Sequence, residues 1–547
     1  MSAPIDFKTM RALVIDDYPS MRSAFKMALA SFGLTKVDLA ATGAEALARV
    51  KAGNYDFIIS DYNLGESRDG QQVLEEMRHR NLIGLETVFL MVTAESVYER
   101  VVAAAELAPD DYLIKPFNGE IMRNRLETIL LKKAVFRQVY RSFARGDMES
   151  SLQGCDEIMK ATPKYAVDAM RFKGEVLIAM GNFDAAEVLY KQVMALRAVP
   201  WSRLGLARAL HLQHKEPMAE GMLHSILAQH PELVSGYDLL ADVQMAQNKA
   251  KDAQITLSRG VKISAKSARR QRRLGEVAYQ NGDLKIAEGA YSGAIEKGKN
   301  SIFFHVNDFA KLSRVHLDQG NVKAAAEVIE NHRKLLQETD AGKLVAAAVM
   351  GEVCVRNENA ERASDYLKEA AKLIQSGVRC EPELALDLVQ ACLSVGMDDE
   401  AANLLEDVAR NAHDSEALID KAKQIYKKFD KEAVGDAIVQ KATERVKNLS
   451  GEGALLVQRG DLLRGVKRLK EASEAAPRNP RILMNAAWAM LRLVEQQGDT
   501  GGLLFDAKQL LSETASLAPE HPRLARLQTM LRGAEARQFM PAQNQLS

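Results

Sequence analysis

Polar residues of the types used in phosphoryl transfer follow four short apolar runs in the first 130 residues. They are Asp16, Asp17, Ser60, Asp61, Thr93 and Lys115. Three carboxylates held close together repel one another unless a cation neutralises them, and an all-oxygen ligand set suits Mg²⁺ rather than zinc. The lysine and the threonine supply hydrogen-bond donors for an anion beside the metal. These residue types predict a site where a carboxylate accepts a phosphoryl group while a metal ion and an ammonium group offset the charge.

A parallel sheet would bring these residues together. The apolar runs do not alternate with polar residues, which is typical of strands buried on both faces. They lie at 13–15, 57–59, 88–92 and 112–114, with a weaker run at 37–39. Amphipathic helical patterns separate them, at 21–30, 43–51, 71–80 and 98–107. The alternation predicts a five-stranded doubly wound α/β domain, whose ligands bind beyond the carboxyl ends of the strands.

Each polar residue also has an alternative, structural interpretation. Asp17 could cap a helix that starts near Pro19, Thr93 could cap the next helix, and Lys115 could be a surface lysine held extended by Pro116. Each alternative explains one residue, but none explains why all of them follow strands of one sheet. We therefore favour a shared site.

Four segments of this region resemble the receiver domain of two-component response regulators, which has the flavodoxin-like doubly wound fold. They are V-I-D-D at 14–17, I-I-S-D at 58–61, M-V-T-A-E at 91–95 and D-Y-L-I-K-P-F at 111–117. The resemblance implies that a histidine kinase phosphorylates Asp61. It implies an Mg²⁺ site made by Asp16, Asp17, Asp61 and the backbone carbonyl of Asn63.

The same resemblance assigns roles to five further positions. Lys115 is expected to contact the acyl phosphate, Thr93 to swing towards it, and Tyr112 to turn inward. Asn63 and Glu95 match the positions that tune phosphate lifetime in this family, with a pair similar to that of chemotaxis regulators. The loop at 63–70 departs from the family pattern because it has no proline and is one residue longer. Since no chemical group is lost, we expect phosphorylation with an altered loop geometry.

The following four hundred residues repeat a two-helix pattern. Gly181 and Gly282 occupy matching turns, each with a glycine seven residues before it and a tyrosine nine residues after it. The pattern resembles the tetratricopeptide repeat, whose period is about 34 residues. Repeats are predicted to start near 132, 167, 200, 234, 268, 306, 344, 382, 446 and 480, with a degenerate pair between 416 and 445 and a capping helix at 523–532. The expected domains are 8–130, 131–534 and a disordered tail at 535–547.

Stacked helix pairs of this kind form an all-α superhelical solenoid with a groove for a peptide or helix. The densest basic run lies at 266–273, where Arg269 and Arg272 are predicted to face the groove and contact an acidic peptide. A solvated helix start is an equally good interpretation of this run. His211 and His214, one turn apart, could suggest a metal site, but no cysteine or carboxylate stands at ligand spacing, so we interpret them as solvated helix-face residues.

Charge and composition limit the classes of function. Lys+Arg and Asp+Glu both number 73 in 547 residues, so no bulk field attracts nucleic acid or an anionic membrane. The balance hides an asymmetry, because residues 1–130 hold 14 basic against 19 acidic residues. Four cysteines without a C-x-x-C pair indicate a reducing cytosol and core positions. We expect neither secretion nor membrane insertion.

The junction between the two regions has no internal glycine or proline from 119 to 145. Its apolar residues keep a helical pattern, which predicts that the last receiver helix runs straight into the first repeat as a rod of roughly 40 Å.

Together these patterns predict a cytoplasmic response regulator that uses Mg²⁺. A sensor histidine kinase or phosphotransfer protein would phosphorylate Asp61 and thereby control protein or peptide binding by the array. The alternative is a constitutive scaffold whose receiver acts as a phosphate sink or docking module. No motif supports a catalytic output domain.

Overall fold

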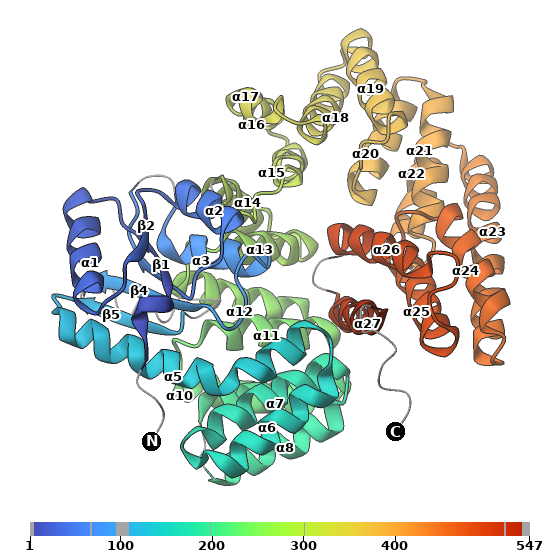
Figure 1. Ribbon diagram of the computed structural model, residues 1–547. Coiled ribbons are helices and arrows are strands. Elements are labelled where there is room, and N and C mark those ends of the chain that lie inside the picture. Colours follow the sequence, from blue (N-terminus) through green and yellow to red (C-terminus); the bar gives the residue numbers. More distant parts are fainter. Residues whose placement is uncertain are drawn as a thin grey trace. The chain divides into compact units, whose positions relative to one another are not determined.

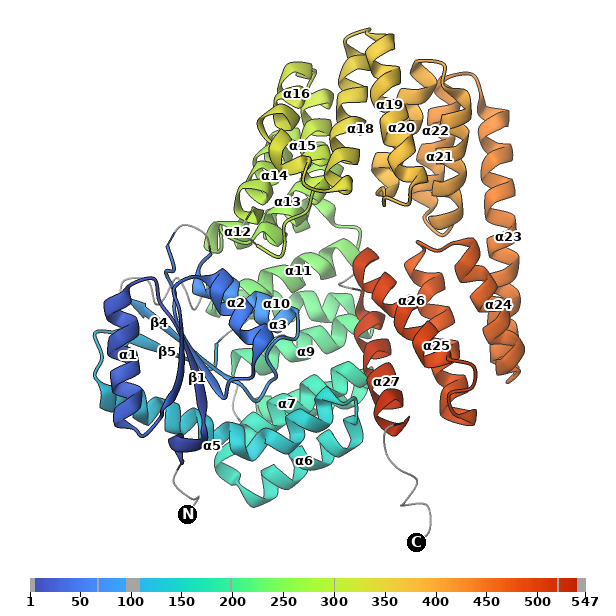
Figure 2. The same cartoon turned by 45° about the horizontal axis from the view of Figure 1, so that its top comes forward.

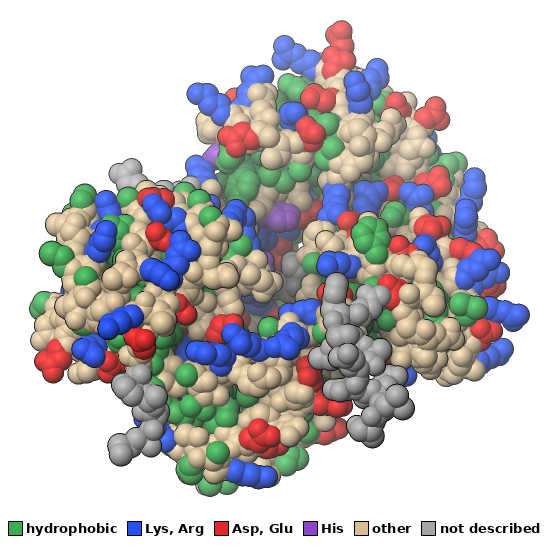
Figure 3. Space-filling model, in the orientation of Figure 1, with side chains coloured by type: hydrophobic (Ala, Val, Ile, Leu, Met, Phe, Trp, Pro, Cys, Tyr) green, Lys and Arg blue, Asp and Glu red, His purple; other side chains and the backbone are tan. Residues whose placement is uncertain are grey.

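A computed structural model describes residues 5–65, 68–94, 109–196, 199–299, 301–518 and 521–538. The helix predicted at 98–107 and Glu95 lie outside the described residues. The chain divides into two compact units, residues 1–304 and residues 305–547. Of the described helices, none is long and apolar enough to cross a membrane. On the face drawn in Figure 3, basic and acidic side chains are interspersed rather than segregated.

A five-stranded parallel sheet forms the first part of the N-terminal unit (Figure 1). Its strands are β1 (Arg11–Ile15), β2 (Lys36–Ala40), β3 (Phe57–Asp61), β4 (Val88–Ala94) and β5 (Asp111–Lys115). Their order, β2-β1-β3-β4-β5, confirms the predicted doubly wound α/β fold. Because every neighbouring pair is parallel, the carboxyl ends of all five strands lie at one edge.

Helices cover both faces of this sheet, as continuous apolar strands require. α1 (Pro19–Ser31) and the first half of α5 (Gly119–Ala144) share one buried cluster with one side of the strands. α2 (Gly43–Ala52) and α3 (Gly70–His79) share a second cluster with the other side. A 3₁₀ turn at Phe7–Thr9 precedes β1. The helices predicted at 21–30, 43–51 and 71–80 are confirmed.

Helix α5 runs from the sheet to the first helices of the array (Figure 2) and contributes side chains to two hydrophobic cores. It is 26 residues long, or about 39 Å at 1.5 Å per residue. Met122 and Leu126 pack in the receiver core, whereas Phe136 and Val139 pack in the core of the first repeat. The predicted continuous helix is confirmed, so the expected boundary at residue 130 falls inside one element.

Antiparallel helix pairs continue the N-terminal unit after α5. They are α6 (Met148–Ala161), α7 (Ala166–Met180), α8 (Phe183–Leu196), α9 (Pro200–Leu212), α10 (Glu216–Gln229), α11 (Val234–Ala246), α12 (Ala250–Ile263), α13 (Ala268–Gln280) and α14 (Leu284–Gly298), with a 3₁₀ turn at Pro163–Tyr165. The first helices of successive pairs start at 166, 200, 234 and 268, as the predicted 34-residue period requires.

Close packing explains the small residues of the repeat pattern. A Cβ at Gly174 would lie 2.6 Å from the ring of Tyr190, and one at Gly275 would lie 2.9 Å from the ring of Tyr291. Gly181 ends α7 with φ at 76°, in the left-handed region that glycine adopts without strain. The glycines and tyrosines identified in the sequence therefore set how closely paired helices approach.

The second unit is all-helical as well. Its helices are α15 (Asn307–Asp318), α16 (Val322–Asn331), α17 (Arg333–Leu336), α18 (Asp340–Arg356), α19 (Ala360–Gln375), α20 (Pro382–Ser394), α21 (Asp398–Asn411), α22 (Glu416–Lys428), α23 (Glu432–Gln458), α24 (Leu462–Ala475), α25 (Pro480–Gln497), α26 (Leu503–Leu517) and α27 (Pro522–Gln538). The predicted starts near 306 and 382 match α15 and α20, whereas α18 starts at 340, four residues before the predicted 344.

Two predicted boundaries in this unit are wrong. No helix starts near 446, because the 27-residue helix α23 runs through that position. A Cβ at Gly453 would lie 2.7 Å from Leu469, so the end of α23 still packs on α24 as a repeat requires. The tail does not begin at Glu535, because α27 continues to Gln538 and Lys508 forms an ion pair with Glu535 at 2.9 Å.

Candidate functional site

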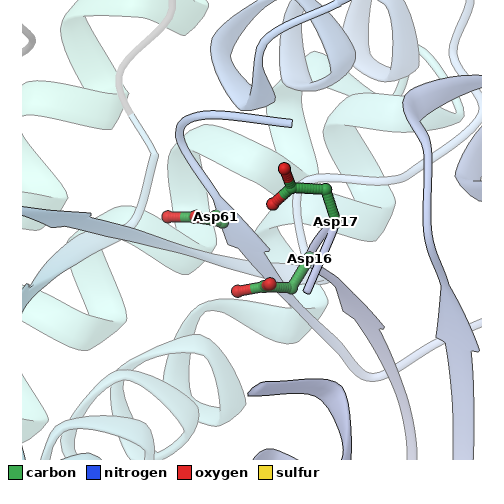
Figure 4. A group of neighbouring side chains, drawn as sticks. All are labelled: Asp16, Asp17 and Asp61. Atoms are coloured by element: carbon green, nitrogen blue, oxygen red, sulfur yellow. The ribbon is translucent and has the colours of Figure 1, made fainter. Parts of the chain in front are cut away.

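Three carboxylates gather at the carboxyl ends of β1 and β3. Asp16 and Asp17 directly follow β1, and Asp61 is the last residue of β3. Figure 4 shows the three side chains at this edge of the sheet, and one oxygen of each lies within 4.8 Å of the others. This spacing suits three ligands of one cation. Among the described residues, no other group of three or more acidic, histidine or cysteine side chains has this property.

The turn after β1 holds the first two carboxylates in place. Helix α1 begins at Pro19 with Tyr18 as its N-cap, and no side chain accepts a hydrogen bond there. The capping role considered for Asp17 is therefore wrong. Oδ1 of Asp16 instead accepts a hydrogen bond from the Tyr18 backbone N–H at 2.8 Å, and Arg22 donates to the Asp16 backbone carbonyl at 2.6 Å.

Two carboxylate oxygens in this turn are buried without a hydrogen-bond donor. Oδ2 of Asp16 and Oδ1 of Asp17 accept no hydrogen bond from the described residues. Buried acceptors ordinarily have a partner, and two such anionic oxygens beside a third carboxylate are the donor set that a hard divalent cation requires. The residues present therefore fit Mg²⁺.

Lys115 completes the charge arrangement from the end of β5. Its Nζ lies 3.1 Å from Oδ2 of Asp61 and 3.7 Å from Oδ2 of Asp16, and its side chain is only 28% exposed. The alternative of a free surface lysine is wrong. An ammonium group so close to Asp61 can offset the charge that a phosphoryl group would bring.

Burial opposes ionisation of the carboxylates. Desolvation raises the pKa of Asp61, and the neighbouring Lys115 ammonium partly offsets that rise. Desolvation also raises the pKa of Asp16, against the hydrogen bond from Tyr18 and the charge of Lys115. The protein thus holds anions where solvent stabilises them poorly, and a bound cation would relieve this cost.

The two residues with predicted switch roles are both buried. Thr93 is 1% exposed in β4, and its hydroxyl donates to the Ala94 carbonyl at 3.4 Å. Tyr112 is buried in β5 among the apolar residues of the α2 and α3 side of the sheet. Asn63 is exposed in the loop after β3. Glu95 lies outside the described residues.

Sequence reasoning missed one residue that shapes the site. A Cβ at Gly70 would lie 2.2 Å from the backbone oxygen of Asp61, so the start of α3 rests directly against the predicted phosphoacceptor. The Asp69-Gly70 pair, with Gln72 following, was a usable signal because it makes the capping box that starts α3.

The basic run at 266–273 is largely engaged within the chain. Arg270 is 2% exposed, and its Nε and Nη2 donate to the two carboxylate oxygens of Asp238 at 2.8 and 2.6 Å. Arg272 donates to the Phe303 carbonyl at 2.7 Å. Groove contacts by Arg269 and Arg272 remain a prediction. The ion pair of the buried Arg270 with Asp238 was not predicted, because the sequence does not show which of several neighbouring arginines is buried.

The solvated position expected for His211 is wrong, because its side chain is only 23% exposed and contacts a carboxylate. Nδ1 of His211 lies 2.7 Å from Oε2 of Glu216, so this histidine has a carboxylate partner. Cys155, Cys354 and Cys392 are buried, as expected of core cysteines. The core position expected of the cysteines does not hold for Cys380, which is half-buried.

Comparison with known proteins identifies the first domain. The family model described as "Response regulator receiver domain" matches residues 12–127. The "Chemotaxis protein CheY" of Pseudomonas aeruginosa is 32% identical over 120 residues, which are 22% of this chain and 95% of that protein. The "Chemotaxis protein CheY-3" of Vibrio cholerae is 31% identical over 122 residues, 22% of this chain and 92% of that protein.

Solved structures match each part of the chain separately. The chemotaxis response regulator CheY4 of Vibrio cholerae is 31% identical, with a TM-score of 0.21, and covers 22% of this chain and 100% of its own. A tetratricopeptide repeat protein from Parabacteroides merdae is 14% identical, with a TM-score of 0.29, and covers 47% of this chain and 96% of its own.

Proposed function

Because this chain belongs to the response regulator receiver family through its N-terminal domain, we propose that phosphorylation of Asp61 controls protein binding by its repeat array. A sensor histidine kinase or a phosphotransfer protein would be the donor. The observation that carries the proposal is the position of Lys115, 3.1 Å from Asp61 at an edge where three carboxylates lie within 4.8 Å.

The chemistry is a transfer between two protein side chains. A carboxylate oxygen of Asp61 forms a bond to phosphorus while the bond from phosphorus to the donor's histidine nitrogen breaks. The donor's imidazole, which carries a proton on its other ring nitrogen, takes the electron pair of that bond and leaves neutral. Lys115 offsets charge on the phosphoryl oxygens. Asp16, Asp17, Asp61 and the backbone carbonyl of Asn63 would hold Mg²⁺, which supplies further charge neutralisation when bound.

Two residues of the sheet would respond to the new phosphate. The Thr93 hydroxyl, at the end of β4, would turn from the Ala94 carbonyl to a phosphoryl oxygen. Tyr112, on the neighbouring strand β5, would repack as it does so. Glu95 and Asn63 would set the lifetime of the phosphate. These movements at the edge of the sheet define the two states of the switch.

The link to the repeats supports a mechanical output. Helix α5 packs in the receiver core through Leu126 and in the first repeat core through Phe136, so a receiver movement reaches the array without a flexible linker. Phosphorylation also adds negative charge to a domain that already holds more acidic than basic residues.

The test compares wild type with Asp61→Asn in the full chain. Label from the cognate kinase or from phosphoramidate should enter wild type and be lost in Asp61→Asn, whereas Glu120→Gln, which removes an exposed carboxylate at the start of α5, should keep it. Immobilised phosphorylated and unphosphorylated chains should then capture different proteins. Equal capture would favour the constitutive scaffold, and label in Asp61→Asn would refute the phosphoacceptor.

A further inference from the structure

A lysine of the repeat array contacts the loop that carries Asn63. The loop joins β3 to α3 and runs from Tyr62 to Asp69, while Lys266 stands in the turn between α12 and α13. Nζ of Lys266 lies 3.3 Å from Oδ2 of Asp69 and 5.4 Å from the centroid of the Tyr62 ring. The Tyr62 side chain also interacts electrostatically with Lys266. One side chain therefore contacts both ends of the loop that follows Asp61.

Both ends of this loop are fixed to the phosphorylation site. The Gly70 N–H donates to the Tyr62 carbonyl at 2.7 Å, which closes the base of the loop. A Cβ at Gly70 would lie 2.2 Å from the backbone oxygen of Asp61, so this base cannot move without moving the site. Asp69 caps α3 through the Gln72 N–H at 2.9 Å. A force on Tyr62 thus reaches the backbone of the neighbouring Asn63.

A second contact lies at the other end of α3. The ring of His79, the last residue of α3, is 5.9 Å from the ring of Phe303. Arg272 holds Phe303 through its backbone carbonyl. The basic run at 266–273 is therefore linked to both ends of α3. Lys266 contacts the first end directly, and Arg272 reaches the other end through Phe303.

We propose that Lys266 is a positioning residue for phosphoryl transfer at Asp61: by holding Tyr62 and Asp69 it fixes the loop that presents the Asn63 carbonyl to the metal. This inference rests on the proposed function of Asp61. The array then completes the environment of the phosphorylation site. A partner that displaces the turn at Lys266 would change the equilibrium free energy of phosphorylation. Phosphorylation would change that partner's binding free energy by the same amount.

The size of the effect follows from exposure. The Lys266 side chain is 68% exposed, so water screens its pairing with Asp69 and the contact tunes the site rather than creates it. We expect a change of about two- to fivefold, the range of exposed charged pairs.

The experiment measures Mg²⁺-dependent phosphorylation of the full chain by phosphoramidate. Here an Asp61 oxygen bonds to phosphorus as the phosphorus–nitrogen bond breaks, and the nitrogen leaves as ammonia after taking a proton. In Lys266→Gln, the Mg²⁺ concentration that gives the half-maximal rate should rise about two- to fivefold. Lys266→Arg should restore it. Lys262→Gln, at an exposed lysine near the end of α12, should match wild type.

A double-mutant comparison separates this contact from a general effect on folding. Tyr62→Phe should raise the same Mg²⁺ concentration less than Lys266→Gln, and the double variant should resemble Lys266→Gln alone. Superimposable Mg²⁺ curves for wild type and Lys266→Gln would overturn the proposal, and so would faster phosphorylation of the variant, because the contact would then cover the site. Absence of label in wild type would instead refute the proposed function.

Discussion

The receiver domain and the repeat array use charged residues in opposite ways. At the receiver edge, Asp16, Asp17 and Asp61 face one another, two of their oxygens lack donors, and the domain holds them there at a cost in stability. In the array, Nε and Nη2 of the buried Arg270 donate to the two carboxylate oxygens of Asp238. The first arrangement is suited to binding a cation and the second to locking two helices together. Substitutions should therefore change chemistry in the receiver and stability in the array.

The largest expected effect is in the array. Arg270→Met leaves the Asp238 carboxylate beside a buried apolar side chain, which should cost about 3–5 kcal/mol of stability. Hydrogen exchange in α11 and α13 measures this loss, with Arg259→Met on the exposed face of α12 as the control. Arg270→Met combined with Asp238→Leu should recover much of it. A loss below 1 kcal/mol would show that the pair does not join the repeats.

The next effect is on receiver chemistry. Lys115→Met removes the ammonium group 3.1 Å from Asp61 and should slow phosphorylation by phosphoramidate about 100-fold, equivalent to about 2.7 kcal/mol. The loss of thermal stability should be smaller than in Arg270→Met. Lys26→Met, on the exposed side of α1, is the matched control. An unchanged phosphorylation rate in Lys115→Met would show that Lys115 does not take part in the transfer.

A smaller effect links the acidic cluster to pH and metal. Because burial raises the pKa of Asp16 and Asp61, the metal-free protein should lose stability as pH rises from their unfolded-state pKa values through the raised folded-state values. The full penalty remains at pH 7. Mg²⁺ at ten times its Kd should then stabilise wild type by about 1.4 kcal/mol.

Asp16→Asn provides the comparison for this metal effect. It should melt higher than wild type in EDTA at pH 7, since one buried anion is gone, and gain little from Mg²⁺. Thermal unfolding of both proteins with and without Mg²⁺ measures this difference. Equal Mg²⁺ stabilisation of both proteins would mean that the ion binds elsewhere.

The smallest effect tests close helix approach in one hairpin of the array. Gly289→Ala, with nothing within 4 Å of the added Cβ, should stabilise α14 by up to about 1 kcal/mol. Gly275→Ala places its Cβ 2.9 Å from Tyr291 and should destabilise by about 1–2 kcal/mol. Effects of the same sign would show that the glycine at the tight position is not needed for packing.

Local patterns were sufficient for much of this structure. The short apolar runs specified the five strands, and parallel pairing then placed Asp16 and Asp61 at one edge. The 34-residue period located the first helices at 166, 200, 234 and 268. Such features depend on residues close in sequence or on the parallel pairing of strands, so they can be predicted from the sequence.

Other features depend on contacts between distant segments. The pairing of Lys266 with Asp69 joins residues 197 positions apart, and no periodicity marks it. The repeat period predicted a start near 446, yet α23 runs through that position, and its Gly453 packs closely on Leu469. Similarly, α27 continues into a segment whose composition suggested a tail, and Glu535 of that segment pairs with Lys508.

The shared helix α5 also fixes the rotational phase of the two domains. Each residue inserted between Leu130 and Phe136 would turn one core by about 100° about the helix axis and move it 1.5 Å along that axis. Such an insertion would separate Lys266 from Asp69 even with every residue of both domains intact. A chimaera with a foreign receiver therefore has to keep the same number of residues between the two cores along α5. Only then would its array respond to phosphorylation of the receiver.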